Sequence, residues 1–203
     1  MQLIYGTSNP AKIKHMRSLL SSLDIEIVGI KELGIVLPNI DESGNNPLEN
    51  ARKKALAYYA TIRRPLFSCD SGLYIERLSD NEQPGVHIRR VNGKVLNDTE
   101  MTDYYSCLAR QYGGKLTAQY RNAICLVVSD TEMYTHCESD IWGEKFLIVD
   151  KPHSKQRVEG FPLDCLSVRL DTDKYYYDDD TEDSIFEQSG WLRFFREALK
   201  GKV

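Results

Sequence analysis

The chain has 203 residues, of which 41% are hydrophobic and 28% charged, and its net charge at pH 7 is −4. This is the balance of a globular protein and argues against a disordered or fibrous chain, while the length suits one α/β domain over residues 1–203. With 30 acidic and 26 basic side chains, no broad attraction to nucleic acid or to an anionic membrane is expected. An anionic ligand would therefore need a local basic pocket.

The sequence also bears on location and redox state. The chain starts without a basic segment and a long apolar run, and no later stretch approaches 18 apolar residues. Neither secretion nor membrane spanning is therefore expected, and a cytoplasmic location is predicted. Five cysteines without C-x-x-C spacing are typical of reduced thiols and not of a disulfide frame or a zinc site.

Strands and helices alternate in the first third of the chain, which predicts a βαβ beginning. The expected elements are a strand at 2–6, a helix at 10–23, a strand at 25–30, a loop at 38–46 and a helix at 47–60. A buried strand is expected at 65–69, ended by Asp70-Ser71-Gly72, before a short strand at 73–75.

The second half of the chain continues the α/β pattern. A helix is predicted near 98–112, ended by Gly113-Gly114, and the strongest strand at 118–129. Strand-like segments at 133–141 and 145–149, a polar segment at 150–159, a tyrosine-rich acidic loop at 175–183 and a helix at 184–199 complete the chain. The fold class is therefore α/β, with a β-sheet flanked by helices.

The junction at 3–12 has the outline of a phosphate site. An apolar strand leads into Thr7-Ser8-Asn9, and the helix that begins at Pro10 carries Lys12. Short polar side chains, unpaired amides at the helix N-terminus and a lysine ammonium would face the same anion. The same letters also describe many βα junctions that bind no ligand.

Two carboxylates suit a hydrolytic site. Glu42 lies in a turn-like segment at 41–44, and Asp70 follows a buried strand, so Asp70–Gly72 and Thr7–Lys12 are expected to face one cleft at the edge of the sheet. A Mg²⁺ ion needs one or two carboxylates plus phosphate oxygens, and an aspartate can orient water for attack on phosphorus.

A lysine beside these carboxylates would neutralise phosphoryl charge. Lys54 lies four residues after Asn50, so the two share a helix face, and we expect both to point toward the ligand. Taken singly, Glu42 could equally be a surface carboxylate, Asp70 the start of an Asx-turn and Lys54 a solvated lysine.

Five motifs in order resemble the inosine/xanthosine triphosphate pyrophosphatase family, which removes aberrant purine nucleotides. Residues 7–12 resemble its T-G-N-x-x-K loop, and residues 41–44 with 47–55 resemble E-E-T-G followed by an E-N-A-x-x-K-A helix. Residues 69–73 are similar to D-D-S-G-L, residues 84–86 with Arg90 to P-G-[IV]-x-x-x-R, and Gly160-Phe161 with Asp164 to G-F-G-Y-D-P.

The resemblance implies an elongated α/β fold with a long mixed sheet, two lobes around a central cleft, and a homodimer. It implies Mg²⁺-dependent hydrolysis of a nucleoside triphosphate to monophosphate and pyrophosphate, with no nucleic acid or membrane partner. Glu42 and Asp70 would hold the metal, and Asp70 with Lys54 would carry the catalysis. The residues that would contact the nucleotide are Thr7, Ser8, Asn9, Lys12, Asn50, Lys54, Ser71, Gly72, Arg90, Phe161 and Asp164.

Within this set, Phe161 would stack on the base, with Asp164 near the edge of the base. The chain departs from the family's pattern at three places. Pro162, Leu163 and Cys165 replace the G-Y and P of the loop that would bind the base. Cys69 replaces an acidic residue beside Asp70, and residues 183–190 replace a lysine followed by S-H-R-G, of which only Gly190 remains. In the family the His and Arg of that motif read the purine, so the hydrolytic half of the site is kept and the base-reading half is rewritten.

The leading hypothesis is a Mg²⁺-dependent nucleoside triphosphate pyrophosphatase for a modified or non-standard purine nucleotide. One alternative is a nucleotide-binding protein with reduced catalysis, and another is an enzyme of the same fold that acts on a different phosphoester.

Overall fold

The computed structural model describes residues 1–154, 157, 161–178 and 185–202, without the side chains of 185–188. Of the positions used above, residues 155–156 and 158–160 around the predicted polar segment, residues 179–184 of the predicted acidic loop and C-terminal motif, and the side chains of 185–188 lie outside the described part. The α-helices are α1 (Pro10–Leu19), α2 (Pro47–Ile62), α3 (Asp98–Gln111) and α4 (Ile185–Ala198). The strands are β1 (Gln2–Tyr5), β2 (Glu26–Gly29), β3 (Leu66–Ile75), β4 (Arg90–Val91), β5 (Lys94–Val95), β6 (Lys115–Val127), β7 (Met133–His136), β8 (Lys145–Val149) and β9 (Ser167–Arg169). Short 3-10 helices are η1 (Ile30–Leu33), η2 (Asp80–Glu82), η3 (Ser139–Ile141), η4 (Asp164–Leu166) and η5 (Tyr176–Asp178).

The described strands form a mixed seven-stranded sheet and a separate two-stranded hairpin. The sheet order is β2-β1-β3-β6-β8-β9, with β7 also paired to β6. β1 is parallel to β2 and β3, whereas β6 is antiparallel to β7 and β8, and β8 is antiparallel to β9. The expected βαβ beginning and the α/β class with a mixed sheet are therefore confirmed.

The chain divides into two compact units. Unit 1 consists of residues 1–71, 121–142 and 184–203, and unit 2 of residues 72–120 and 143–183. The single domain, the elongated shape and the central cleft stay predictions.

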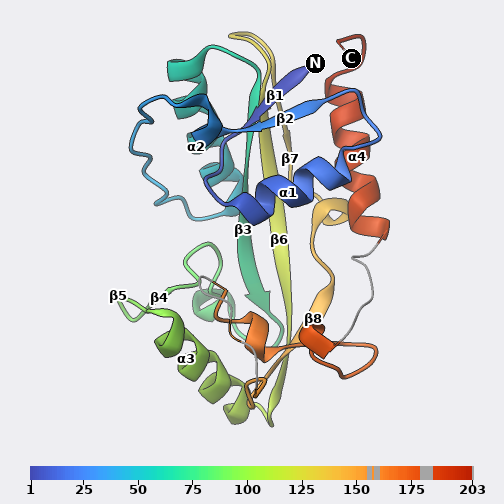
Figure 1. Ribbon diagram of the computed structural model, residues 1–203. Helices are drawn as coiled ribbons and strands as arrows, with labels where there is room; N and C mark the ends of the chain where they lie inside the picture. Colours follow the sequence, from blue (N-terminus) through green and yellow to red (C-terminus); the bar gives the residue numbers. More distant parts are fainter. Residues whose placement is uncertain (155–156, 158–160, 179–184, 203) are drawn as a thin grey trace. The chain divides into compact units, whose positions relative to one another are not determined.

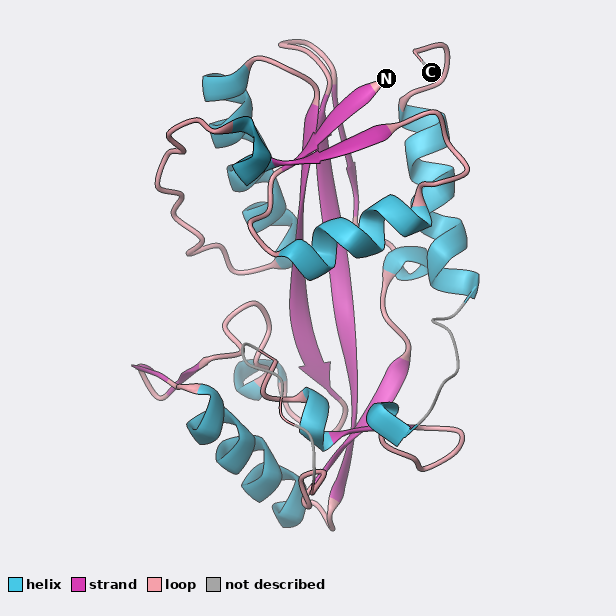
Figure 2. Cartoon of the chain, in the orientation of Figure 1, coloured by secondary structure: helices cyan, strands magenta, loops and turns pink. Residues whose placement is uncertain are grey.

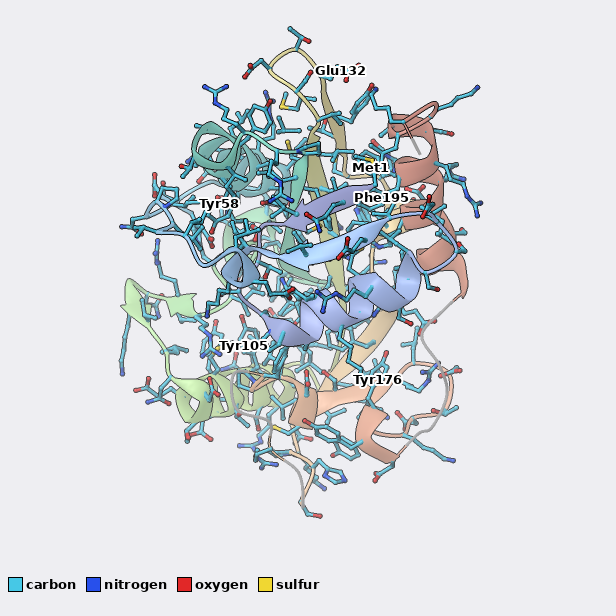
Figure 3. The ribbon with its side chains drawn as sticks, turned by 45° about the horizontal axis from the view of Figure 1, so that its top comes forward. Met1, Tyr58, Tyr105, Glu132, Tyr176 and Phe195 are labelled. Carbon is cyan, nitrogen blue, oxygen red and sulfur yellow. The ribbon has the colours of Figure 1, made fainter. Side chains whose placement is uncertain are left out.

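Strand residues of unit 1 alternate between two apolar cores. Leu3 and Tyr5 of β1 point to one face of the sheet, which α1 and α4 cover (Figure 1). Ile4 and Leu66 point to the other face, which α2 covers. Phe195 of α4, marked in Figure 3, is fully buried in the first of these cores. The period of two along each strand thus decides which side chains meet α2 and which meet α1.

Unit 2 has a core of its own around α3. Met101, Tyr105 and Ala109 lie one helical turn apart and are buried. The hydroxyl of Tyr105, marked in Figure 3, donates to the carbonyl oxygen of Ile88 at 3.0 Å. The hairpin β4–β5 leads directly into α3 (Figure 2).

β3 differs most from the sequence prediction. The predicted break at Asp70-Ser71-Gly72 is wrong, because β3 runs without interruption from Leu66 to Ile75. An aspartate starts an Asx-turn by bonding its own backbone two residues on. The carboxylate of Asp70 bonds side chains of α2 instead, so the aspartate lies inside the strand.

Other differences concern the ends of elements. α1 ends four residues before the predicted end, α2 extends two residues further, and the 133–141 segment splits into β7 and η3. The sequence pattern missed β4, β5 and β9, since strands of two or three residues are too short to show an alternation. All five cysteines are free, as predicted. Within the described residues, the helices lack the length and apolar character that crossing a bilayer requires.

Candidate active site

Asp70 lies at the centre of a buried polar cluster in unit 1. Lys54 Nζ donates to Asp70 Oδ1 at 2.9 Å, and Asn50 Nδ2 donates to Asp70 Oδ2 at 3.0 Å. The side chains of Lys54 and Asp70 are only 11% and 16% exposed. The electrostatic attraction of an ion pair increases as water is excluded, so the ammonium of Lys54 and the carboxylate of Asp70 attract each other more strongly than an exposed pair would.

Local folding brings these three side chains together. α2 begins at Asn46, whose side chain caps the helix by accepting from the amide of Glu49 at 2.9 Å. Asn50 and Lys54 are then one turn apart on the buried face of α2, as their spacing predicts. In β3, Asp70 shares the α2 side with Leu66, because alternate strand residues point to one face.

Glu42 also lies near the ammonium of Lys54. Its Oε1 atom is 3.8 Å from Lys54 Nζ, and its side chain is 56% exposed. Within the described residues, no group of three or more His, Cys, Asp or Glu side chains could hold a metal. Two carboxylates beside open solvent nevertheless fit Mg²⁺, which takes few protein ligands and completes its shell with water and phosphate oxygens.

The β1–α1 junction differs from the expected anion site. Asn9 Oδ1 accepts hydrogen bonds from the amides of Ala11 at 2.9 Å and Lys12 at 3.4 Å, and Ile13 N donates to the Asn9 carbonyl. The prediction of unpaired amides at this helix end is therefore wrong, because asparagine is a favoured N-cap. Ser8 and Lys12 are exposed, and the amide of Asn9 donates to Thr7 Oγ1 at 3.3 Å.

Cys69 connects this junction to the Asp70 cluster. Its thiol hydrogen-bonds with the hydroxyl of Tyr5, and burial raises the pKa of Cys69 from 9.0 to about 12. The charges of Lys12 and Lys54 oppose that rise without overcoming it. The charges of Lys12 and Lys54 are therefore both felt at the thiol of Cys69, which stays neutral.

Ser71 points to the opposite face of β3 from Asp70 and bonds Asn122 of β6. Asn122 Nδ2 donates to the Ile141 carbonyl oxygen at 2.7 Å, and Ser71 Oγ donates to Asn122 Oδ1 at 2.7 Å. A carbonyl oxygen can only accept, so the amide is fixed and Ser71 must supply the proton. Asn122 was not predicted as a site residue. Its only signal in the sequence is a polar side chain within the predicted strand 118–129.

Unit 2 holds the remaining predicted residues around a pocket of about 350 Å³. Arg90, Phe161 and Asp164 line it, and Phe161 is 39% exposed. Burial raises the pKa of Asp164 above its usual value of 3.8. The neighbouring Arg89 pairs with Asp98 at 2.7 Å. The pocket thus combines an aromatic face, a desolvated carboxyl group and a guanidinium group.

The structure therefore distributes the predicted site over both units. In unit 1, Lys54 contacts both Glu42 and Asp70, Asn50 bonds Asp70, and the charge of Lys12 in the 7–12 segment acts on Cys69 beside Asp70. Gly72, Arg90, Phe161 and Asp164 belong to unit 2, where Gly72 is a buried residue of β3.

Comparisons with known proteins bear on the family and the fold of the chain. Residues 3–172 match the Ham1 family. A dITP/XTP pyrophosphatase of Bradyrhizobium diazoefficiens is 31% identical over 136 residues, which cover 65% of this chain and 63% of the relative, slightly less than two thirds of its length. The dITP/XTP pyrophosphatase of Bacillus subtilis is 28% identical over 174 residues, which cover 85% of this chain and 83% of the relative. The Ham1 protein of Staphylococcus aureus has the same fold, with a TM-score of 0.71 and 21% identity over 100% of both chains.

Proposed function

Because the chain belongs to the Ham1 family, we propose that it hydrolyses a nucleoside triphosphate to the monophosphate and pyrophosphate. The observation that carries the proposal is the buried contact of Asp70 with Lys54. The carboxylate of Glu42 lies 3.8 Å from the same ammonium. Similarity to dITP/XTP pyrophosphatases favours a non-standard purine nucleotide as the substrate.

In this proposal Asp70 is the general base. Each of its oxygens accepts one hydrogen bond and keeps a lone pair for a further proton. Asp70 takes a proton from water as the water oxygen bonds the α-phosphorus, and the bond from that phosphorus to the bridging oxygen breaks. Pyrophosphate leaves with the bridging oxygen, while Lys54 and Lys12 stabilise the charge on the phosphoryl oxygens.

Glu42 and Asp70 are the residues that would hold Mg²⁺. When bound, the ion would polarise phosphate oxygens and offset their charge. The two carboxylates and Lys54 carry a net charge of −1, which favours a cation at this place. Since Lys54 is within 4 Å of both carboxylates, it would also be close to any phosphate oxygen that the ion binds.

The pocket of unit 2 is the proposed base site. Phe161 offers a partly exposed ring for stacking, and Asp164 a carboxyl group for an N–H group of the base. The family's His and Arg are replaced in this chain, so the base preference is proposed to differ from that of its relatives. Homodimer formation and a cytoplasmic location remain proposals that follow from the family.

A second candidate is a nucleotide-binding protein with reduced catalysis. The neutral thiol of Cys69 favours it, because one negative charge beside the proposed metal is missing. Such a protein would bind a nucleotide with Mg²⁺ and release no product.

The test compares the wild-type protein with Asp70→Asn on dITP, XTP and the common nucleoside triphosphates. Turnover is expected to fall by at least about a hundredfold, since general bases contribute on this order, while nucleotide binding persists. Asp103→Asn, an exposed change on α3, is the matched control and should keep full turnover. Unchanged turnover in Asp70→Asn would contradict the assignment. Binding without product in the wild-type protein would favour the second candidate.

A further inference from the structure

We propose that Asn50 is a positioning residue, whose buried amide couples the segment that carries Glu42 to the carboxylate of Asp70. Asn50 is predicted from the sequence to bind phosphate, but the structure gives it two protein partners instead. The inference rests on the proposed function, because it concerns the same pair of carboxylates.

The direction of each hydrogen bond follows from groups that have no choice. The backbone amide of Gly44 can only donate, so the Asn50 atom 2.8 Å away is the oxygen Oδ1. The amide nitrogen Nδ2 must then face Asp70 Oδ2, at 3.0 Å. Asn50 therefore accepts from the 41–44 segment at one end and donates to Asp70 at the other.

Burial makes this arrangement difficult to exchange for a phosphate contact. Asn50 is only 2% exposed, and both ends of its amide are bonded to protein. Turning Nδ2 toward a phosphate would leave Asp70 Oδ2 without this donor. Buried polar groups that lose a partner destabilise a fold, so the amide is expected to stay in place when the nucleotide binds.

Gly44 is built to fit the same contact. A Cβ atom at this position would lie 2.4 Å from Asn50 Oδ1, and the backbone of Gly44 is not in the left-handed region. The absence of a side chain is therefore required by the close approach of Asn50. Gly44 lies two residues after Glu42. The hydrogen bond from Gly44 to Asn50 therefore holds the backbone close to the residue that carries this carboxylate.

The two ends of the link allow a double-mutant cycle. Asn50→Ala removes the amide, and Gly44→Ala displaces it while the side chains of Asn50, Asp70 and Lys54 are all kept. We expect each single variant to lower kcat on the order of tenfold, with KM within about twofold, because misplaced groups lose rate more than binding. The double variant should be no slower than Asn50→Ala alone, since the added methyl group then meets only Glu49 Cδ at 3.2 Å, near the end of a flexible side chain.

Two matched controls separate this effect from general damage. Asn45→Ala changes an exposed asparagine in the same segment, and Gly143→Ala adds a Cβ that would have only ordinary contacts at 3.6 Å. Both should keep the kcat of the wild-type protein. Gly44→Ala keeps the inference testable if Asn50→Ala fails to fold. A raised KM with unchanged kcat in Asn50→Ala, or strictly additive effects in the cycle, would overturn the positioning role in favour of direct phosphate contact.

Hydrogen exchange provides a readout that needs neither nucleotide nor Mg²⁺. Asn50→Ala should speed the exchange of the Gly44 amide by about fivefold, the factor expected for one lost hydrogen bond, whereas Asn45→Ala should not. If wild-type protein turns over no nucleotide, the proposed function fails while this exchange still decides whether the link exists. Unchanged exchange at Gly44 would overturn the coupling itself.

Discussion

Cys69 shows how a single departure from the family's motif changes the charge of the site. An acidic residue at this place would add a negative charge beside Asp70, whereas burial raises the pKa of the thiol to about 12. Without a metal ion the thiol therefore stays protonated throughout the physiological pH range, so it adds no negative charge to attract one. The carboxylates of the proposed metal site are Glu42 and Asp70.

This raised pKa predicts slow alkylation of Cys69. The pKa lies about three units above the ordinary value of 9.0, so at pH 8 the thiolate fraction is about a thousandfold lower than that of an ordinary cysteine. The rate should rise about tenfold per pH unit up to pH 12. Iodoacetamide labelling followed by mass spectrometry measures it, with the exposed Cys107 as the internal reference. Equal labelling of Cys69 and Cys107 at pH 8 would contradict the assigned environment.

At the scale of residues, spacing predicts which helix positions share a face but not what each side chain bonds. Asn50 and Lys54 occupy one buried face, as expected from their separation of four. The bonds from Asn50 to Gly44 and Asp70 depend on how the preceding loop and β3 pack against α2. A periodic sequence pattern within α2 does not predict such contacts. Asn122 was missed for the same reason, since its partner Ser71 lies on another strand.

Among the elements, the packing of α4 explains why Gly190 is the one residue of the family's C-terminal motif that this chain keeps. Gly190 is buried where α4 packs against η3. A Cβ atom there would lie 1.9 Å from the carbonyl oxygen of Asp140, which is backbone and cannot swing away. Gly190 is therefore required for packing, independently of any role in reading a base.

Gly190→Ala should consequently destabilise the protein. Alanine is worth about 1 kcal/mol more than glycine in a helix interior, so a variant judged by helix propensity alone would gain stability. Overpacking against the Asp140 carbonyl should instead cost about 1–3 kcal/mol. Denaturant unfolding measures the difference, and Gly143→Ala, which has room for a Cβ, is the control. A gain in stability for Gly190→Ala would show that α4 and η3 do not pack in this way.

Long elements follow from the sequence, and element ends depend on tertiary partners. α2, α3 and β8 lie where hydrophobic periodicity places them. β3 continues through a Ser-Gly pair that normally indicates a turn, because Asp70 is held by α2 and its neighbours stay in the sheet. No secondary structure was predicted for the short hairpin β4–β5. This hairpin carries the predicted site residue Arg90, which lines the pocket of unit 2.

For the whole molecule, composition and site chemistry have to be reconciled. A net charge of −4 does not attract a triphosphate, so binding must come from local cations. In the proposed function these cations are Lys12 and Lys54 in unit 1 and Arg90 in unit 2. The family and the α/β class could be inferred from ordered motifs and periodicity. Two lobes were implied by the resemblance alone, and the residues at which the two compact units divide could not be inferred from periodicity, since β3 and β6 each contribute to both.

Identification of the products by ³¹P NMR is the most direct test of the proposed hydrolysis. With Mg²⁺ and dITP or XTP, the spectrum should show monophosphate and pyrophosphate in equal amounts. EDTA should stop the reaction without unfolding the protein, because Lys54 pairs with the buried Asp70 without any metal and the second carboxylate, Glu42, is exposed. Release of orthophosphate and a nucleoside diphosphate would contradict attack at the α-phosphorus and the assignment of this chain as a pyrophosphatase.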